Sequence, residues 1–146
     1  MKDFSKTRKK VLITGGAGYV GSSMVRNLLN NSFEVVVLDN LQMGGDGVIC
    51  FLGYPGYEFY KGDIRNSGDV EKAIKGADYV VHLAAIVGEP ASKKYPEDTK
   101  TINIDGTENV FRIAKKNGVR KFVFFSTCSS YGVQETDVLA DENTPL

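Results

Sequence analysis

Three glycines spaced three residues apart are the residues of this sequence whose type and spacing best define a chemistry. Gly15, Gly18 and Gly21 follow the aliphatic residues 11–13 in the stretch VLITGGAGYVG. Between a strand and a helix, the first two glycines allow a tight turn whose backbone N–H groups approach a pyrophosphate, and the third lets the helix lie close to the strand. The spacing predicts dinucleotide binding, with an ordinary glycine-rich loop as the alternative interpretation.

An acidic residue after the next aliphatic run indicates which dinucleotide is bound. Asp39 comes 18 residues after Gly21 and directly follows residues 34–38. A carboxylate at the tip of a second strand accepts hydrogen bonds from the 2′- and 3′-hydroxyls of an adenosine ribose. No Lys or Arg occurs among the next twenty residues, so a 2′-phosphate would meet carboxylate repulsion without a cation. The pattern favours NAD over NADP, while a turn or capping role for Asp39 is the alternative.

Two further strand ends carry candidate contacts. Asp63 and Ile64 follow a strand expected at 57–61 and are candidates for contacts with the adenine base, although a plain strand-end Asp is an equal alternative. Small residues after a strand at 78–83 suit a backbone that passes close to a cofactor. His82, the one histidine of the chain, ends that strand, and we expect a hydrogen-bonded core residue there rather than a catalyst.

The elements that position these residues alternate along the chain. Aliphatic runs predict strands at 11–14, 34–38 and 78–83, and residues 57–61 and 121–125 are the third and fifth strand candidates. Helical patterns follow residue 19, residue 66 and residue 96, the last continuing to about residue 116. Residues 41–56 contain five glycines and a proline and are expected to form a loop. The alternation predicts an α/β fold, a Rossmann-type doubly wound parallel sheet of about five strands in order 3-2-1-4-5, in three α/β/α layers. Its ligand crevice is expected beside Gly15 and Val87.

Composition restricts the class of protein. The 146 residues suffice for one domain, expected over residues 1–146, and the net charge of zero argues against nucleic acid or an anionic membrane as a partner. No apolar run is long enough to span a membrane and no signal-peptide pattern is present, so we expect a cytoplasmic protein. Cys50 and Cys128 form no metal-ligand pattern, so we expect free thiols and no metal.

Six segments together resemble the extended short-chain dehydrogenase/reductases, and specifically the NAD-dependent nucleotide-sugar epimerases and dehydratases. The segments are residues 14–21 (TGGAGYVG), 38–40 (LDN), 62–64 (GDI), 82–85 (HLAA), 103–107 (NIDGT) and 126–132 (STCSSYG). The resemblance implies an NAD cofactor contacted by Gly15, Gly18, Tyr19, Val20, Gly21, Asp39, Asn40, Asp63, Ile64, Leu83, Ala84, Ala85, Asn103 and Ser126.

The resemblance also implies a role for each group of these residues. The Tyr19 and Val20 backbones would bind the pyrophosphate, Asp39 and Asn40 the ribose, Asp63 and Ile64 the adenine, and residues 83–85 would line the nicotinamide side. Asn103 would hold a neighbouring strand end in place.

The implied reaction is the transient oxidation of a hydroxyl of a UDP-, GDP- or dTDP-linked sugar. Thr127 stands where the family carries the Ser or Thr that hydrogen-bonds this hydroxyl. Cys128 and Ser129 replace the Asp-Glu pair of the sugar 4,6-dehydratases, which disfavours dehydration relative to epimerisation. The resemblance further implies a homodimer formed through the helix at 96–117.

The catalytic base of the family is not found in this sequence. Family members carry a Tyr base and, one helical turn later, a Lys, both after the Ser/Thr motif, but no Tyr or Lys follows Gly132 here. Residues 141–146 resemble the segment that precedes that helix. We therefore expect the NAD-binding portion of an epimerase, truncated before the catalytic helix and substrate domain and inactive alone. A stand-alone, non-catalytic dinucleotide-binding or dimerising module, or a dehydratase or reductase of the same family, is the alternative.

Overall fold

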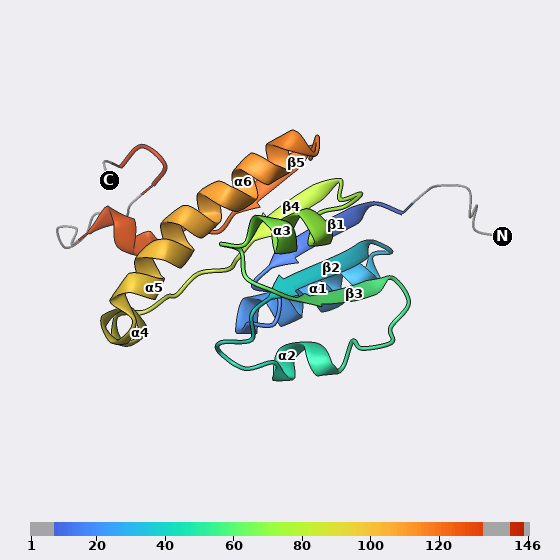
Figure 1. Ribbon diagram of the computed structural model, residues 1–146, viewed down its shortest axis with the longest axis horizontal. Helices are drawn as coiled ribbons and strands as arrows, with labels where there is room; N and C mark the ends of the chain where they lie inside the picture. Colours follow the sequence, from blue (N-terminus) through green and yellow to red (C-terminus); the bar gives the residue numbers. More distant parts are fainter. Residues whose placement is uncertain (1–7, 133–140, 145–146) are drawn as a thin grey trace.

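A five-stranded parallel sheet forms the centre of the computed structural model, which describes residues 8–132 and 141–144 (Figure 1). The strands are β1 (Lys10–Thr14), β2 (Glu34–Asp39), β3 (Tyr57–Lys61), β4 (Tyr79–His82) and β5 (Lys121–Phe124). They lie in the order β3-β2-β1-β4-β5, and each pairs with its neighbours in parallel. The predicted Rossmann-type sheet and its strand order are confirmed.

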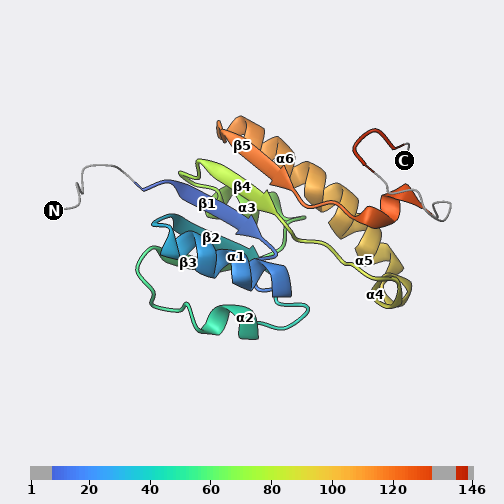
Figure 2. The same ribbon diagram turned by 180° about the vertical axis from the view of Figure 1, so that it is seen from behind.

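Helices cover both faces of the sheet (Figures 1 and 2). They are α1 (Tyr19–Asn30), α2 (Asp46–Ile49), α3 (Ser67–Ala73), α4 (Glu89–Lys94), α5 (Pro96–Lys100), the π-helix η1 (Thr101–Gly106), α6 (Thr107–Lys116) and the 3₁₀-helix η2 (Cys128–Tyr131). Because side chains alternate along a strand, β1 buries Leu12 against α3 and α6 on one face, and Val11 and Ile13 against α1 on the other. The result is the predicted three-layer α/β/α arrangement.

The helix expected from residue 96 to about residue 116 differs in one respect. Its middle turn, η1, is a π-helix, and Figure 1 shows α5, η1 and α6 as one continuous rod. The Asn103 side chain of η1 accepts a hydrogen bond from Ile86 N at 2.8 Å and donates one to Ile86 O at 2.9 Å. Gly106 ends η1 against Ile64, where an added Cβ would lie 2.6 Å from Cδ1. These contacts tie the helix to two strand ends, and apolar periodicity does not reveal them.

The loop expected at 41–56 contains the four-residue helix α2. Val48 of α2 is buried in the core on the α1 face of the sheet. Gly47 permits this packing, because a Cβ there would lie 2.7 Å from Ala17 O in the glycine turn. The loop therefore lies against the turn.

No helix in the described part of the chain is both long and apolar enough to cross a membrane.

Candidate functional site

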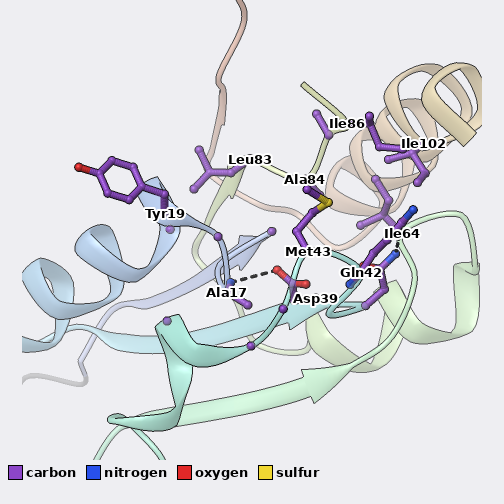
Figure 3. A pocket seen from close by; sticks show the side chains of 18 of the residues that line it. Ala17, Tyr19, Asp39, Gln42, Met43, Ile64, Leu83, Ala84, Ile86 and Ile102 are labelled. Atoms are coloured by element: carbon purple, nitrogen blue, oxygen red, sulfur yellow. Dashed lines mark hydrogen bonds between the residues drawn. The ribbon is translucent and has the colours of Figure 1, made fainter. Parts of the chain in front are cut away.

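A cavity of about 550 Å³ opens at the carboxyl ends of the central strands (Figure 3). It is lined by residues from segments 15–21, 39–47, 62–64 and 83–87 and by Ile102. Its volume lies within the roughly 300–1,000 Å³ typical of small-molecule and cofactor sites. Twelve of the predicted cofactor residues line it: Gly15, Gly18, Tyr19, Val20, Gly21, Asp39, Asn40, Asp63, Ile64, Leu83, Ala84 and Ala85. Within residues 8–132 and 141–144, no cluster of His, Cys, Asp or Glu is arranged to hold a metal ion.

At Gly15 and Gly21 of the glycine turn, an added Cβ would collide with backbone atoms. Gly15 has φ +72°, and an added Cβ would lie 2.7 Å from the Ala84 backbone. Its N–H donates to Leu38 O at 2.9 Å, so the turn is held between the ends of β2 and β4. At Gly21 a Cβ would lie 2.7 Å from Gly15 O, which shows that α1 begins in direct contact with the turn.

The N-terminus of α1 offers backbone donors to this cavity. The cap residue Gly18 supplies no side-chain hydrogen bond, and the first turn contains no acidic residue. Helical bonding starts where Ser22 N donates to Gly18 O at 3.0 Å, so the preceding N–H groups lack helical acceptors. The Tyr19 side chain is 95% exposed and points away from the cavity (Figure 3). This arrangement suits an anion bound by the backbone.

Asp39 connects the end of β2 to the glycine turn. Its Oδ2 accepts a hydrogen bond from Ala17 N at 3.0 Å, drawn as a dashed line in Figure 3, and its Oδ1 accepts one from Leu41 N at 2.8 Å. Leu41 has φ +62°, a left-handed conformation that is uncommon for leucine. Asp39 thus stabilises two turns, which is the alternative role that the sequence allowed, and it also lines the cavity.

Asp63 and Ile64, which follow β3, also line the cavity. Hydrogen bonds from the Arg65 side chain are the largest cause that holds the pKa of the Asp63 carboxyl below its ordinary value. The Asn40 side chain makes a smaller contribution that lowers the same pKa. Ile64 is buried and packs in the core with Ile102 of η1.

Three predicted site residues do not line the cavity. Asn103 acts through its two bonds to Ile86. Ser126 and Thr127 follow β5, one strand beyond β4, and both are exposed. Thr127 Oγ1 accepts a hydrogen bond from Ser129 N at 3.2 Å, which caps η2. The predicted catalytic hydroxyl therefore stands beside the cavity.

Several lining residues were not predicted from the sequence. They are Ala17, Gln42, Met43, Gly44, Gly45, Asp46, Gly47, Gly62, Ile86 and Ile102, in addition to Val87, which was placed only near the crevice. The glycine-rich stretch directly after the predicted ribose carboxylate is the signal that points to residues 42–47. Ile102 has a weaker signal, its position next to the NIDGT segment.

His82 is buried at the end of β4 and fully hydrogen-bonded, as expected. Its Nδ1 lies 2.7 Å from Thr14 Oγ1, and its Nε2 lies 2.9 Å from Thr107 Oγ1. Phe124 stacks on the ring at 5.9 Å between ring centroids. Burial lowers the pKa of His82 from 6.5 to about 4. The ring therefore joins β1, β4 and α6 in its neutral form.

This burial predicts that stability falls as the pH is lowered from 6.5 toward 4. Unfolded His82 binds a proton below its ordinary pKa of 6.5, whereas folded His82 stays neutral down to about 4. The shift is worth about 3 kcal/mol at the low end of this window, and about 2 kcal/mol near pH 5. Urea unfolding at pH 7 and near pH 5 measures the loss. His82→Gln is expected to be less stable at both pH values, with a smaller difference between them. An equal pH dependence in both proteins would contradict the assignment to His82.

Comparisons with known proteins agree with this geometry. Residues 11–146 match the NAD dependent epimerase/dehydratase family. UDP-glucose 4-epimerase from Streptomyces lividans is 42% identical over 132 residues, which cover 86% of this chain and 38% of that protein. The chain spans 36–46% of the length of the curated relatives that it matches.

Solved structures show the same likeness. The structure of UDP-glucose 4-epimerase from Thermus thermophilus in complex with NAD is 34% identical, with a TM-score of 0.83 over 93% of this chain and 43% of that one. A dTDP-glucose 4,6-dehydratase from Streptomyces venezuelae, solved with NAD bound, is 32% identical, with a TM-score of 0.86 over 94% of this chain and 45% of that one.

Proposed function

This chain belongs to the NAD-dependent epimerase/dehydratase family, and on that premise we propose that it is the NAD-binding portion of a nucleotide-sugar epimerase. The observation that carries the proposal is the cavity in which the glycine turn, the Asp39 carboxylate and the Asp63–Ile64 strand end meet. These are the three groups that a dinucleotide needs for its pyrophosphate, ribose and base.

The cavity offers groups suited to NAD, and its volume of about 550 Å³ lies in the range of cofactor sites. The N–H groups at the start of α1 would bind the pyrophosphate, and the missing Cβ atoms of Gly15 and Gly21 let the turn pack closely against the end of β4 and the start of α1. Asp39 would accept hydrogen bonds from the ribose hydroxyls, and the family resemblance implies that the backbone at Ala84 and Ala85 would line the nicotinamide side. Bound NAD supplies a hydride acceptor. The chain itself orients that acceptor and contributes the Thr127 hydroxyl next to the cavity.

Epimerisation is the reaction that we favour within the family. A 4,6-dehydratase needs an acid and a base for the elimination of water, and the resemblance places that pair where this sequence has Cys128 and Ser129. Neither supplies a carboxylate. The chain is accordingly a closer match in chemistry to the 4-epimerases than to the dehydratases that share its fold.

Asp39 predicts a preference for NAD over NADP. The carboxylate accepts hydrogen bonds from two ribose hydroxyls, whereas a 2′-phosphate would place a second negative charge beside it. The difference is expected to be about 2–3 kcal/mol, or roughly 30- to 150-fold in dissociation constant. Isothermal titration calorimetry with both cofactors measures it.

Two variants test whether Asp39 is the cause. Asp39→Asn is expected to bring the dissociation constants of NAD and NADP closer together. It should also weaken the binding of NAD, because the carboxylate oxygen that accepts from Ala17 N is replaced by an amide group. Asp105→Asn removes an exposed carboxylate of η1 outside the cavity and should leave the ratio unchanged. Equal affinity of the unmodified chain for both cofactors would count against the proposal.

We also propose that the chain forms a homodimer through the outer side of η1 and α6. Ile104 is 51% exposed and Phe111 is 54% exposed, although Phe111 also packs edge-on against Phe122. Apolar side chains on the outer face of a helix, opposite the face that is buried in the core, are typical of a helix–helix interface. A second copy would cover both.

Analytical ultracentrifugation is expected to show self-association at high micromolar concentration. The Phe111→Lys variant should shift the protein toward the monomer, because a charge in an apolar contact opposes association. Lys115→Ala changes an exposed residue of the same helix and serves as the control. A monodisperse monomer across the concentration series would argue against the dimer.

A further inference from the structure

Arg65 holds both oxygens of the Asp63 carboxylate. Its Nε donates to Asp63 Oδ1 at 3.0 Å, its Nη2 donates to Oδ2 at 2.6 Å, and its backbone N donates to Oδ1 at 2.9 Å. Paired donors on a planar guanidinium fix the plane of a carboxylate as well as its charge. The pKa of Asp63 is lowered by the same contacts.

The other terminal nitrogen of Arg65, Nη1, contacts the helices α5 and η1. Nη1 donates to Asp98 Oδ1 of α5 at 2.8 Å and to Thr101 Oγ1 of η1 at 3.0 Å. These partners lie 33 and 36 residues farther along the chain. The guanidinium is therefore held on two sides, and it holds Asp63 in turn.

Asp63 keeps capacity for one more donor. An ionised carboxylate offers about four lone-pair positions. Arg65 fills three of these positions: its backbone N donates to Oδ1, its Nη2 donates to Oδ2, and its Nε is shared between Oδ1 at 3.0 Å and Oδ2 at 3.2 Å. Asp63 lines the cavity and follows β3, which lies two strands from β1 and the glycine turn. A purine that carries an exocyclic amino group is a donor suited to this oxygen.

We propose that Arg65 is a positioning residue for base recognition: braced by Asp98 and Thr101, it fixes Asp63 so that the carboxylate accepts from the 6-amino group of adenine. This proposal rests on the proposed binding of NAD. Arg65 is about one-third exposed, so its ion pairs contribute little to stability and its effect is on selectivity between bases.

The test compares NAD with nicotinamide hypoxanthine dinucleotide, in which a carbonyl acceptor replaces the 6-amino donor. The unmodified chain is expected to bind NAD about tenfold more tightly, as one hydrogen bond to a charged group implies. Arg65→Met should reduce this ratio at least about threefold, because Asp63 then rotates freely. Arg65→Lys should also reduce it, since an ammonium cannot hold both carboxylate oxygens and Asp98 at once.

Lys116→Met provides the control. Among the contacts described, the Lys116 side chain pairs only with Glu71 of α3, at 3.1 Å, and neither residue lines the cavity. This variant should leave the ratio of the two dissociation constants unchanged. A loss of affinity by Arg65→Met that is equal for both dinucleotides would show a merely structural role and overturn the inference, while the proposed NAD site would stand. No measurable binding of NAD by the unmodified chain would instead refute the proposed function itself.

Discussion

A protein of these 146 residues, saturated with NAD, is expected to leave nucleotide sugars unchanged. Oxidation of a sugar hydroxyl needs a hydride acceptor, a base for the proton and a surface that orients the ring. The chain binds NAD, the hydride acceptor, and supplies the Thr127 hydroxyl. The family resemblance implies a Tyr that acts as the base and a Lys that assists it, but no Tyr or Lys follows Gly132. Positioned base catalysis contributes about 10²–10⁴-fold, and orientation contributes about 7–11 kcal/mol more. Without both, turnover falls below detection.

The measurement incubates the chain and NAD with UDP-glucose, UDP-galactose, UDP-N-acetylglucosamine and dTDP-glucose. Reduced cofactor is followed by absorbance, and epimerised sugar by chromatography. The Thermus thermophilus epimerase, assayed in parallel, shows that the conditions support turnover. Calorimetry on the same sample must show bound NAD, so that inactivity is not the result of an empty site. Turnover that disappears in Thr127→Ala would reveal another base and refute the expectation.

Gly15→Ala is expected to abolish NAD binding and to destabilise the fold severely. The methyl group would lie 2.7 Å from both Cα and N of Ala84, and these are backbone atoms of a strand end that cannot move aside cheaply. The residue also has φ +72°, which costs alanine about 1–2 kcal/mol. Together with overpacking of about 1–3 kcal/mol, the loss is about 2–5 kcal/mol, a large part of a typical stability of roughly 5–15 kcal/mol.

Gly76→Ala is the matched control for this prediction. Gly76 has φ +73°, almost the same as Gly15, but an added Cβ would meet nothing within 4 Å. The Gly76→Ala variant therefore measures the cost of the positive φ angle alone, without the collision that Gly15→Ala makes with Ala84. Urea unfolding should show a loss of about 1–2 kcal/mol for Gly76→Ala and unchanged NAD affinity. Equal losses in the two variants would show that the close approach of β4 does not limit the turn.

The fold could be predicted because its pattern is local. Each buried strand is a short aliphatic run, and each turn is marked by glycine or a polar cap, such as Asn66, whose side chain accepts from Gly68 N at 2.9 Å. The order of the strands then follows from the right-handed connections of parallel sheets. The glycine turn and Asp39 could be placed in the site for the same reason, since strand ends at one edge must lie close together.

Other parts of the site depend on contacts between distant residues. The π turn of η1 is accompanied by the pairing of Asn103 with Ile86, and residues 42–47 reach the cavity because Gly47 fits against Ala17. Helical periodicity and turn chemistry describe neither contact. The position of Thr127 beside the cavity is likewise set by the place of β5 as the fifth strand, two strands away from the glycine turn.

The central place of β1 has a consequence for biosynthesis. β1 is translated first, yet its two neighbours come later: β2 at Glu34–Asp39 and β4 at Tyr79–His82. While the ribosome produces the residues between them, the nascent sheet of β1, β2 and β3 exposes the unpaired edge of β1. Such an edge attracts other strands, which makes this interval the one most prone to misfolding. The glycine turn packs against the backbone of Ala84, and this contact forms only when Ala84 has emerged from the ribosome. Nascent chains therefore become competent to bind NAD late in their synthesis.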